Sequence, residues 1–265
     1  MRGTVTALAA RRRHPVATAV LLLLGLVATG LVYSALTPGR AVAAEPAARD
    51  IQAGRELFLA NCSSCHGVNA QGRNNAPSLV GVGAASVDFQ VATGRMPAQA
   101  TGPQVPEQNQ VRYTSEQIRQ LAAYVASLGP GPDIPSPEQV DPARGNASRG
   151  AAIFRTNCAM CHNFAGKGGA LTRGKYAPSL DGTSPQHIFE AMLTGPQSMP
   201  VFNDQVIDQQ GKRDIVAYLK TVQETPSPGG LSLGAIGPVS EGLVAWAVGI
   251  VGLIGCAVWL GAKSS

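Results

Sequence analysis

The sequence contains one short pattern twice, NCSSCH at residues 61–66 and NCAMCH at residues 157–162. Each copy places two cysteines three positions apart and a histidine directly after the second cysteine. The same glycine and phenylalanine precede both copies, in GRELF at 54–58 and in GAAIF at 150–154. The constant offset of 96 residues between the copies predicts an internal duplication.

The duplication continues further along the chain in the same order. APSL at 76–79 recurs at 177–180. TGRMP at 93–97 recurs as TGPQSMP at 194–200, with two additional residues before the methionine. Because several features match in one order, we interpret the middle of the chain as two homologous domains.

An Ala-Tyr pair at 123–124 also recurs, at 217–218, and it marks the end of each copy. We therefore expect one domain at residues 50–128 and a second at 146–222. Between them lies a stretch rich in proline and glycine, which predicts a semi-stiff linker at 129–145. Apolar residues at helical spacing predict a helix at 188–193.

Cys-x-x-Cys-His is the attachment sequence of c-type haem. The two thiols must reach two vinyl groups on one edge of a porphyrin, and a short helical turn presents both of them. The adjacent histidine then faces the iron. We expect two covalently bound c-type haems, and their candidate residues are Cys62, Cys65 and His66 in the first copy and Cys158, Cys161 and His162 in the second.

Other uses of this cysteine spacing fit the chain less well. The alternatives are a thioredoxin-like dithiol, half of a zinc site and a plain disulfide. A zinc site needs two more ligands for each copy, and the fifth cysteine, Cys256, lies in an apolar segment. A dithiol needs neither the histidine nor the Met-Pro pair that follows each copy, so haem attachment is favoured.

Methionine is the expected second axial ligand, and it gives a low-spin haem of raised reduction potential. Met96 has no competitor in the first copy. In the second copy we favour Met199, which alone shares the Thr-Gly…Met-Pro frame, and we assign Met192 to a packing face. Met160, inside the attachment loop, lies on the wrong side of its ring. His187 leaves bis-histidine ligation open, although its place at a helix start favours a surface residue.

Composition excludes a nucleic-acid partner. The 265 residues are 45% hydrophobic and only 14% charged, with a formal net charge of +5. Five arginines that precede Glu45 account for this excess, and the remaining 16 basic residues balance 16 acidic ones. The basic character therefore belongs to one end of the chain. Few charges with many apolar residues favour membrane-embedded segments over a disordered chain.

Two apolar segments predict transmembrane helices at 16–36 and 241–262, in contact with membrane lipid, and the second has no charge after Glu241. A basic tail at 1–15 precedes the first, and a linker at 223–240 precedes the second. Because basic residues stay on the cytoplasmic side, we expect both termini in the cytoplasm. The haem domains then lie on the extracytoplasmic side of the cell membrane.

The first apolar segment has a second interpretation, as a cleaved signal peptide. The small residues AVA at 41–43 have the form of a cleavage site. The apolar run is longer than usual for a signal peptide and ends several residues before that site, which favours a retained anchor. Both interpretations place the middle of the chain outside the cytoplasm.

On these residues each repeat resembles class I cytochrome c, which implies a mainly α fold with two tandem domains of this kind. The resemblance implies that a glycine and an aromatic residue of the first helix pack against an aromatic residue of the last. It also implies that a proline carbonyl accepts a hydrogen bond from the ligand histidine, with a leucine against the porphyrin. The residues concerned are Gly54, Phe58, Tyr124, Pro77 and Leu79 in the first repeat, and Gly150, Phe154, Tyr218, Pro178 and Leu180 in the second. The histidine-to-proline spacing departs between repeats, since it is eleven residues in the first and sixteen in the second.

The whole layout resembles the dihaem cytochrome c subunit of the actinobacterial cytochrome bcc complex, a quinol:cytochrome c reductase. The resemblance implies partners in cytochrome b and the Rieske iron–sulfur protein, and electron delivery to cytochrome c oxidase. It implies an electron carrier that belongs to a translocase and has no catalytic residues of its own.

Two other functions compete with this one. The same carrier module occurs in cbb-type oxidases and in periplasmic dehydrogenases, but the apolar segment after both haem domains argues against them. A dihaem peroxidase needs an open iron site with acid–base residues nearby, and the sequence shows no cluster placed for that chemistry.

Overall fold

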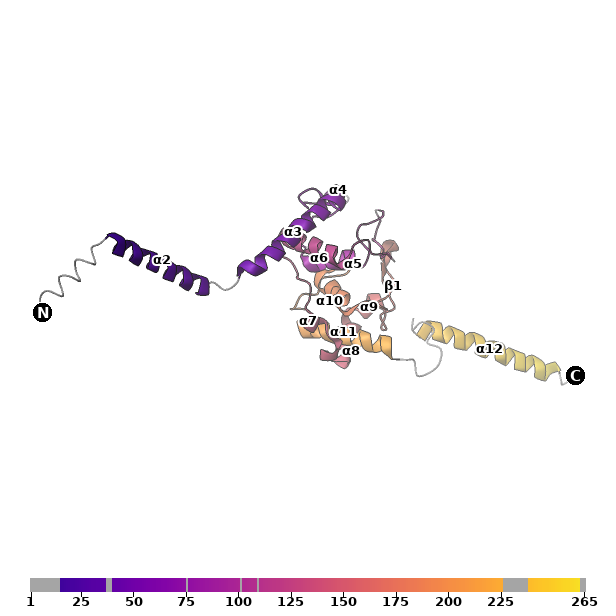
Figure 1. The fold of residues 1–265 in the computed structure, drawn as a ribbon. Helices are drawn as coiled ribbons and strands as arrows, with labels where there is room; N and C mark the ends of the chain where they lie inside the picture. Colours follow the sequence, from indigo (N-terminus) through magenta and orange to yellow (C-terminus); the bar gives the residue numbers. More distant parts are fainter. Residues whose placement is uncertain are drawn as a thin grey trace, which may run out of the picture. The chain divides into compact units, whose positions relative to one another are not determined.

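A computed structural model describes residues 15–36, 40–74, 76–100, 102–108, 110–225 and 238–262. The basic tail before residue 15, most of the linker expected at 223–240, and the last three residues lie outside this range. Figure 1 shows the helices and strands along the chain. The described part is mainly helical, as expected, with one pair of very short strands.

Within the described residues, two helices are long and apolar enough to cross a membrane. They are α2 (Pro15–Leu36) and α12 (Pro238–Ala262). Their apolar side chains are exposed, for example 74% at Leu26 and 72% at Leu253. A helix that is apolar on all sides needs a protein core or a lipid bilayer around it. Because nothing in the described protein covers these helices, they fit a membrane-anchored chain.

The first cytochrome-like domain is formed by the later part of α3 (Arg40–Asn61), α4 (Ser63–His66), α5 (Ala84–Ala92) and α6 (Ser115–Ala126). Helices α3 and α6 cross closely at Gly54, where an added Cβ would lie 1.9 Å from the carbonyl oxygen of Gln120. Phe58 then stacks on Tyr124 with ring centroids 5.3 Å apart. The contact of Gly54 and Phe58 on the first helix with Tyr124 on the last is the one that the resemblance to class I cytochrome c implies.

The second domain repeats this crossing. Its helices are α8 (Ala147–Asn157), α9 (Ala159–His162), α10 (Pro185–Thr194) and α11 (Gln209–Glu224). Helices α8 and α11 lie side by side in Figure 1. A Cβ on Gly150 would lie 1.9 Å from the carbonyl oxygen of Asp214. Phe154 and Tyr218 have ring centroids 5.4 Å apart, almost as in the first domain.

Polar residues at helix starts explain where several helices begin. Thr114 forms a capping box with Gln117 at the start of α6. Ser184 accepts a hydrogen bond from the His187 amide at the start of α10, and Asp208 accepts one from Gly211 at the start of α11. Each cap satisfies a backbone N–H that has no partner within its helix.

The loop between the haem motif and α10 is longer in the second domain, and the extra residues have structure. Strand β1 (Gly169–Ala170) pairs antiparallel with β2 (Tyr176–Ala177), and the turn η2 (Thr172–Gly174) connects them. Glycines with positive φ at positions 168 and 174 allow the tight turns. The sequence predicts an insertion at this place, but its strands are too short to be recognised from a pattern.

The segment expected as a semi-stiff linker at 129–145 packs against both domains. The Pro132 carbonyl accepts a hydrogen bond from the Ala85 amide at the start of α5. Helix α7 (Pro137–Val140) and the turn η1 (Pro142–Arg144) contact α11 of the second domain. An added Cβ on Gly145 would lie 2.7 Å from the Ala217 side chain.

Helices α5 and α10 bring the two domains into direct contact. The Gln186 amide donates a hydrogen bond of 2.9 Å to the Asp88 carboxylate across this junction. The His187 imidazole lies 3.7 Å from the same carboxylate and meets the edge of the Phe89 ring. The expectation of a surface position for His187 is therefore wrong, because the first domain covers most of its side chain.

Candidate haem sites

The second Cys-x-x-Cys-His pattern forms a short helical turn at the end of α8. The backbone amides of Cys161 and His162 both donate to the carbonyl of Cys158, at 3.1 and 2.9 Å. The first pattern has the same geometry, since the amides of Cys65 and His66 donate to the Cys62 carbonyl at 3.2 and 3.0 Å. The turn that the attachment chemistry requires is present in both domains.

A proline carbonyl orients each histidine. His66 Nδ1 lies 2.8 Å from the Pro77 oxygen, and His162 Nδ1 lies 3.1 Å from the Pro178 oxygen. A carbonyl only accepts hydrogen bonds, so Nδ1 carries the proton in each ring. Nε2 is then the nitrogen with a free lone pair, which is the form that ligates a metal.

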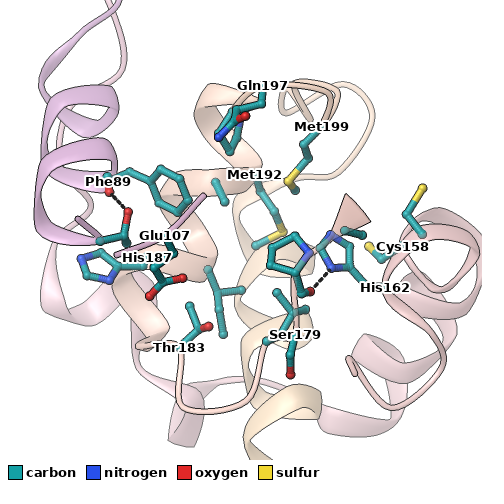
Figure 2. Close-up of a pocket in the computed structure, with 18 of the residues that line it drawn as sticks. Phe89, Glu107, Cys158, His162, Ser179, Thr183, His187, Met192, Gln197 and Met199 are labelled. Carbon is teal, nitrogen blue, oxygen red and sulfur yellow. Dashed lines mark hydrogen bonds between the residues drawn. The ribbon is translucent and has the colours of Figure 1, made fainter. Parts of the chain in front are cut away.

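A cavity of about 420 Å³ lies beside the second motif. This volume is typical of small-molecule and cofactor sites. Figure 2 shows His162, Met192 and Met199 directed into it. The cavity brings together the four residues expected for the second haem, which are Cys158, Cys161, His162 and Met199.

Both methionines of the second domain line the cavity, but they differ in role. Met192 is 2% exposed and belongs to the core cluster around Phe154. Val91 has the same place in the first domain, two residues before a Thr-Gly pair and inside the core. Met199 is half-buried on the following loop, where the first domain has Met96. The structure therefore supports the assignment of Met192 to packing.

The first domain places its candidate residues around its own core. His66 is buried, Cys62 and Met96 are half-buried and pack on the core cluster, and Cys65 is exposed. Leu79 also packs on this cluster. The repeat positions of the two sites therefore correspond.

The protonation of these groups follows from burial. Burial raises the pKa of Cys62 to about 11 and that of Cys158 to about 12, and the second cysteine of each pair adds to the shift. Redox dithiols instead have a thiol of lowered pKa. Burial lowers the pKa of His162 more than the Pro178 hydrogen bond raises it, so the imidazole is neutral at pH 7.

Two remaining candidates lie away from the ligand positions. Met160, inside the attachment loop, is 94% exposed and points to solvent. His187 also lines the cavity, but Figure 2 shows it at the side opposite His162, next to Phe89.

Residues of the first domain form one wall of the cavity in the second domain. The sequence alone does not predict this wall. Phe89, Arg95, Gln104 and Glu107 are the main contributors to this wall. The Gln104 side chain donates to the Tyr176 carbonyl and accepts from the Tyr176 amide, both at 2.9 Å. Tyr176 belongs to the insertion of the second repeat. The longer spacing there was therefore the one sequence feature that pointed to this contact between the domains.

The donor set fits a covalently bound haem. Two thiols, one neutral imidazole and one thioether line a mainly apolar cavity. Nitrogen and sulfur donors suit low-spin haem iron. A zinc site would need further ligands of the cysteine or histidine type beside the same motif.

Comparison with protein families agrees with the two-domain interpretation. The family described as "Cytochrome c" matches residues 51–129. The family described as "Cytochrome C oxidase, cbb3-type, subunit III" matches residues 145–219. Cytochrome c domains imply covalently attached c-type haem.

Similar proteins extend over nearly the whole chain. The cytochrome bc1 complex cytochrome c subunit of Corynebacterium efficiens is 46% identical over 95% of this chain and 90% of its own length. The subunit of the same name from Mycobacterium tuberculosis is 45% identical over 96% and 93%. The cbb3-type oxidase subunit FixP of Sinorhizobium medicae is 32% identical over only 49% and 44%. The chain belongs to the family of cytochrome c subunits of the cytochrome bc1 complex.

Proposed function

We propose that the chain binds two c-type haems, one in each domain, as the electron-transfer subunit of a respiratory quinol:cytochrome c reductase. The proposed thioether links and iron ligands are Cys62, Cys65, His66 and Met96 for the first haem, and Cys158, Cys161, His162 and Met199 for the second. The observation that carries the proposal is the paired geometry of His66 with Pro77 and of His162 with Pro178.

The residues around each site have separate tasks. The proline carbonyls fix the imidazole planes and hold a proton on Nδ1. The Met96 and Met199 thioethers would hold the iron as soft sulfur ligands, which favour the ferrous state. The bound haem supplies a reversible one-electron change. The chain itself converts no substrate and acts as the carrier.

The family membership indicates the neighbours in the complex. We infer that electrons arrive from the Rieske iron–sulfur protein next to cytochrome b, and that they leave toward cytochrome c oxidase. Purification of the complex in mild detergent, followed by quinol-driven reduction of both haems, tests the donor side. Added oxidase must then reoxidise them. Reduction of neither haem by quinol would refute this placement.

We infer two membrane spans, α2 and α12, with both termini in the cytoplasm and the haem domains on the opposite side. The apolar, exposed surfaces of the two helices support the spans, and the arginines at 11–13 support the orientation. Protease added to intact spheroplasts is expected to cleave the haem domains. Protection of these domains until the membrane is permeabilised would reverse the topology.

The number of haems is tested directly by the pyridine haemochrome assay after acid–acetone washing. Two equivalents per chain are expected. The double variant Cys158→Ala/Cys161→Ala should retain one equivalent, and its matched counterpart Cys62→Ala/Cys65→Ala should do the same. A wild-type chain with fewer than two equivalents would contradict the proposal.

A further inference from the structure

One cationic side chain of the first domain lies in the cavity of the second. Arg95 is the only arginine or lysine among the described residues that line this cavity. It is 8% exposed, although arginine is almost never buried without a partner. It also directly precedes Met96, the proposed ligand of the first haem.

The contacts of Arg95 with Phe89 and Glu107 leave some N–H groups of its guanidinium able to donate to a further acceptor. Its Cζ lies 4.9 Å from the centre of the Phe89 ring, a cation–π contact. Its Nη2 donates a hydrogen bond of 3.2 Å to the carboxylate of Glu107. The Glu107 side chain is 58% exposed, so solvent screens this pair. The Arg95 guanidinium has five N–H groups, and the hydrogen bond to Glu107 uses one of them.

The covalent links determine which edge of a haem would face Arg95. The vinyl groups lie on one edge of the porphyrin, and the two propionates lie on the opposite edge. Figure 2 shows Cys158 and His162 at one side of the cavity and Phe89 and Glu107 at the other. A haem attached at Cys158 and Cys161 therefore directs its propionates toward the first domain.

Two propionates in this cavity need a positive partner. An ionised carboxylate that leaves water without a cation or hydrogen-bond donors carries a large desolvation penalty. Arginine binds carboxylates through two parallel N–H···O bonds, which makes it the preferred partner of such groups. The side-chain carboxylates that line the cavity, Glu107 and Asp181, have the wrong charge for this task.

We propose that Arg95 of the first domain binds a propionate of the haem of the second domain, so that residues of both domains complete this one site. The proposal rests on haem attachment at Cys158 and Cys161. Arg95 would then link the two sites along the chain, since it directly precedes Met96, the proposed ligand of the first haem.

Redox titration of the full chain with Arg95→Gln tests this role. Reduction adds a negative charge to the haem, and a nearby cation favours it, so loss of Arg95 is expected to lower the midpoint potential of the second haem. The matched control is Glu107→Gln, which removes the carboxylate partner and retains the cation. It is expected to shift the same potential in the opposite direction.

Resonance Raman spectroscopy provides a second readout. The propionate bending band of one haem is expected to shift in Arg95→Gln, because a charge-assisted hydrogen bond is lost. A purely structural role at the domain junction would move neither this band nor the potential. Unchanged band and potential with two covalent haems retained would overturn the proposal.

The conservative variant Arg95→Lys covers the case in which Arg95→Gln fails to fold. Lysine keeps the charge and loses the bidentate fork, so the band is expected to shift while the potential falls less. A wild-type band and potential in Arg95→Lys would refute a hydrogen bond from Arg95. A wild-type chain without the second haem would instead refute the proposed function, so the two failures are distinguishable.

Discussion

Gln197 of the second domain and Val105 of the first exchange two hydrogen bonds. The Val105 amide donates to Gln197 Oε1 at 2.8 Å, and Gln197 Nε2 donates to the Val105 carbonyl at 2.7 Å. Gln197 lies two residues before Met199, in the part of the loop that the first repeat lacks. The additional residues of the methionine loop therefore bind this loop to the neighbouring domain.

We expect Gln197→Ala to loosen the Met199 loop. The loss of the two exposed hydrogen bonds between Gln197 and Val105 should lower the free energy of unfolding by about 1 kcal/mol. It should also weaken the far-red charge-transfer band of methionine-ligated iron, because Met199 is no longer held in place. Urea denaturation and absorption spectroscopy measure both effects.

The control for this prediction is Gln99→Ala. Gln99 forms a similar exposed amide pair with Gln108, but within the first domain. If both variants change the far-red band equally, the band does not report on the contact between Gln197 and Val105.

The two methionines of the second cavity should respond differently to substitution. Met199→Ala is expected to retain covalent haem and to lower the potential of the second haem, because the thioether ligand is lost. Met192→Ala should leave that potential unchanged and lower the free energy of unfolding by about 2–5 kcal/mol, as for a large core residue. Redox titration and denaturation separate these outcomes. Equal potentials in wild type and Met199→Ala would show that Met199 is not the ligand.

The sequence predicts the features that depend on local chemistry. Repeated cysteine, histidine and proline positions determine the geometry around His66 and His162, and both prolines accept the expected hydrogen bonds. Glycines at the helix crossings follow from the resemblance in the same way. Such features lie within a single domain and recur in both repeats, so the repeated motifs together with the resemblance locate them.

Repeated motifs do not predict which residues of one domain contact the other. The position of Arg95 beside Met96 gives no sign that its side chain enters the other domain's cavity. Similarly, His187 has a helix-start pattern typical of the surface, yet the α5–α10 contact covers it. These positions depend on how two folded domains pack, which leaves no periodic signal in either segment.

Gly54→Ala and Gly150→Ala should both destabilise the protein. In each case the new Cβ would lie 1.9 Å from a backbone oxygen of the crossing helix, so the helices must move apart. Overpacking of this kind costs about 1–3 kcal/mol or more. Thermal denaturation measures the loss. Gly102→Ala is the matched control, since its Cβ would find its nearest neighbour at 3.6 Å, and comparable losses at all three glycines would contradict a steric cause.

Glu190 should make the stability depend on pH. Its side chain is fully buried, and burial followed by the nearby charge of Asp88 raises its pKa from 4.5 to about 8. Between these two values the folded protein binds more protons than the unfolded chain, so the free energy of unfolding falls as the pH rises. Glu190→Gln keeps the shape and removes this proton uptake. Its profile should therefore be flatter than that of the wild type between pH 5 and pH 8 in urea titrations.

Asp88 and His187 lie beside the Glu190 carboxyl group, with the polar atoms of the three side chains within 4.8 Å of one another. Both remain in Glu190→Gln, so the difference between the two profiles isolates Glu190. Asp88→Asn removes the like charge and should reduce the slope without abolishing it, because burial is the larger cause of the shift. Parallel profiles for wild type and Glu190→Gln would mean that Glu190 ionises normally. The junction between α5 and α10 would then have to be open to water, contrary to the burial of this residue.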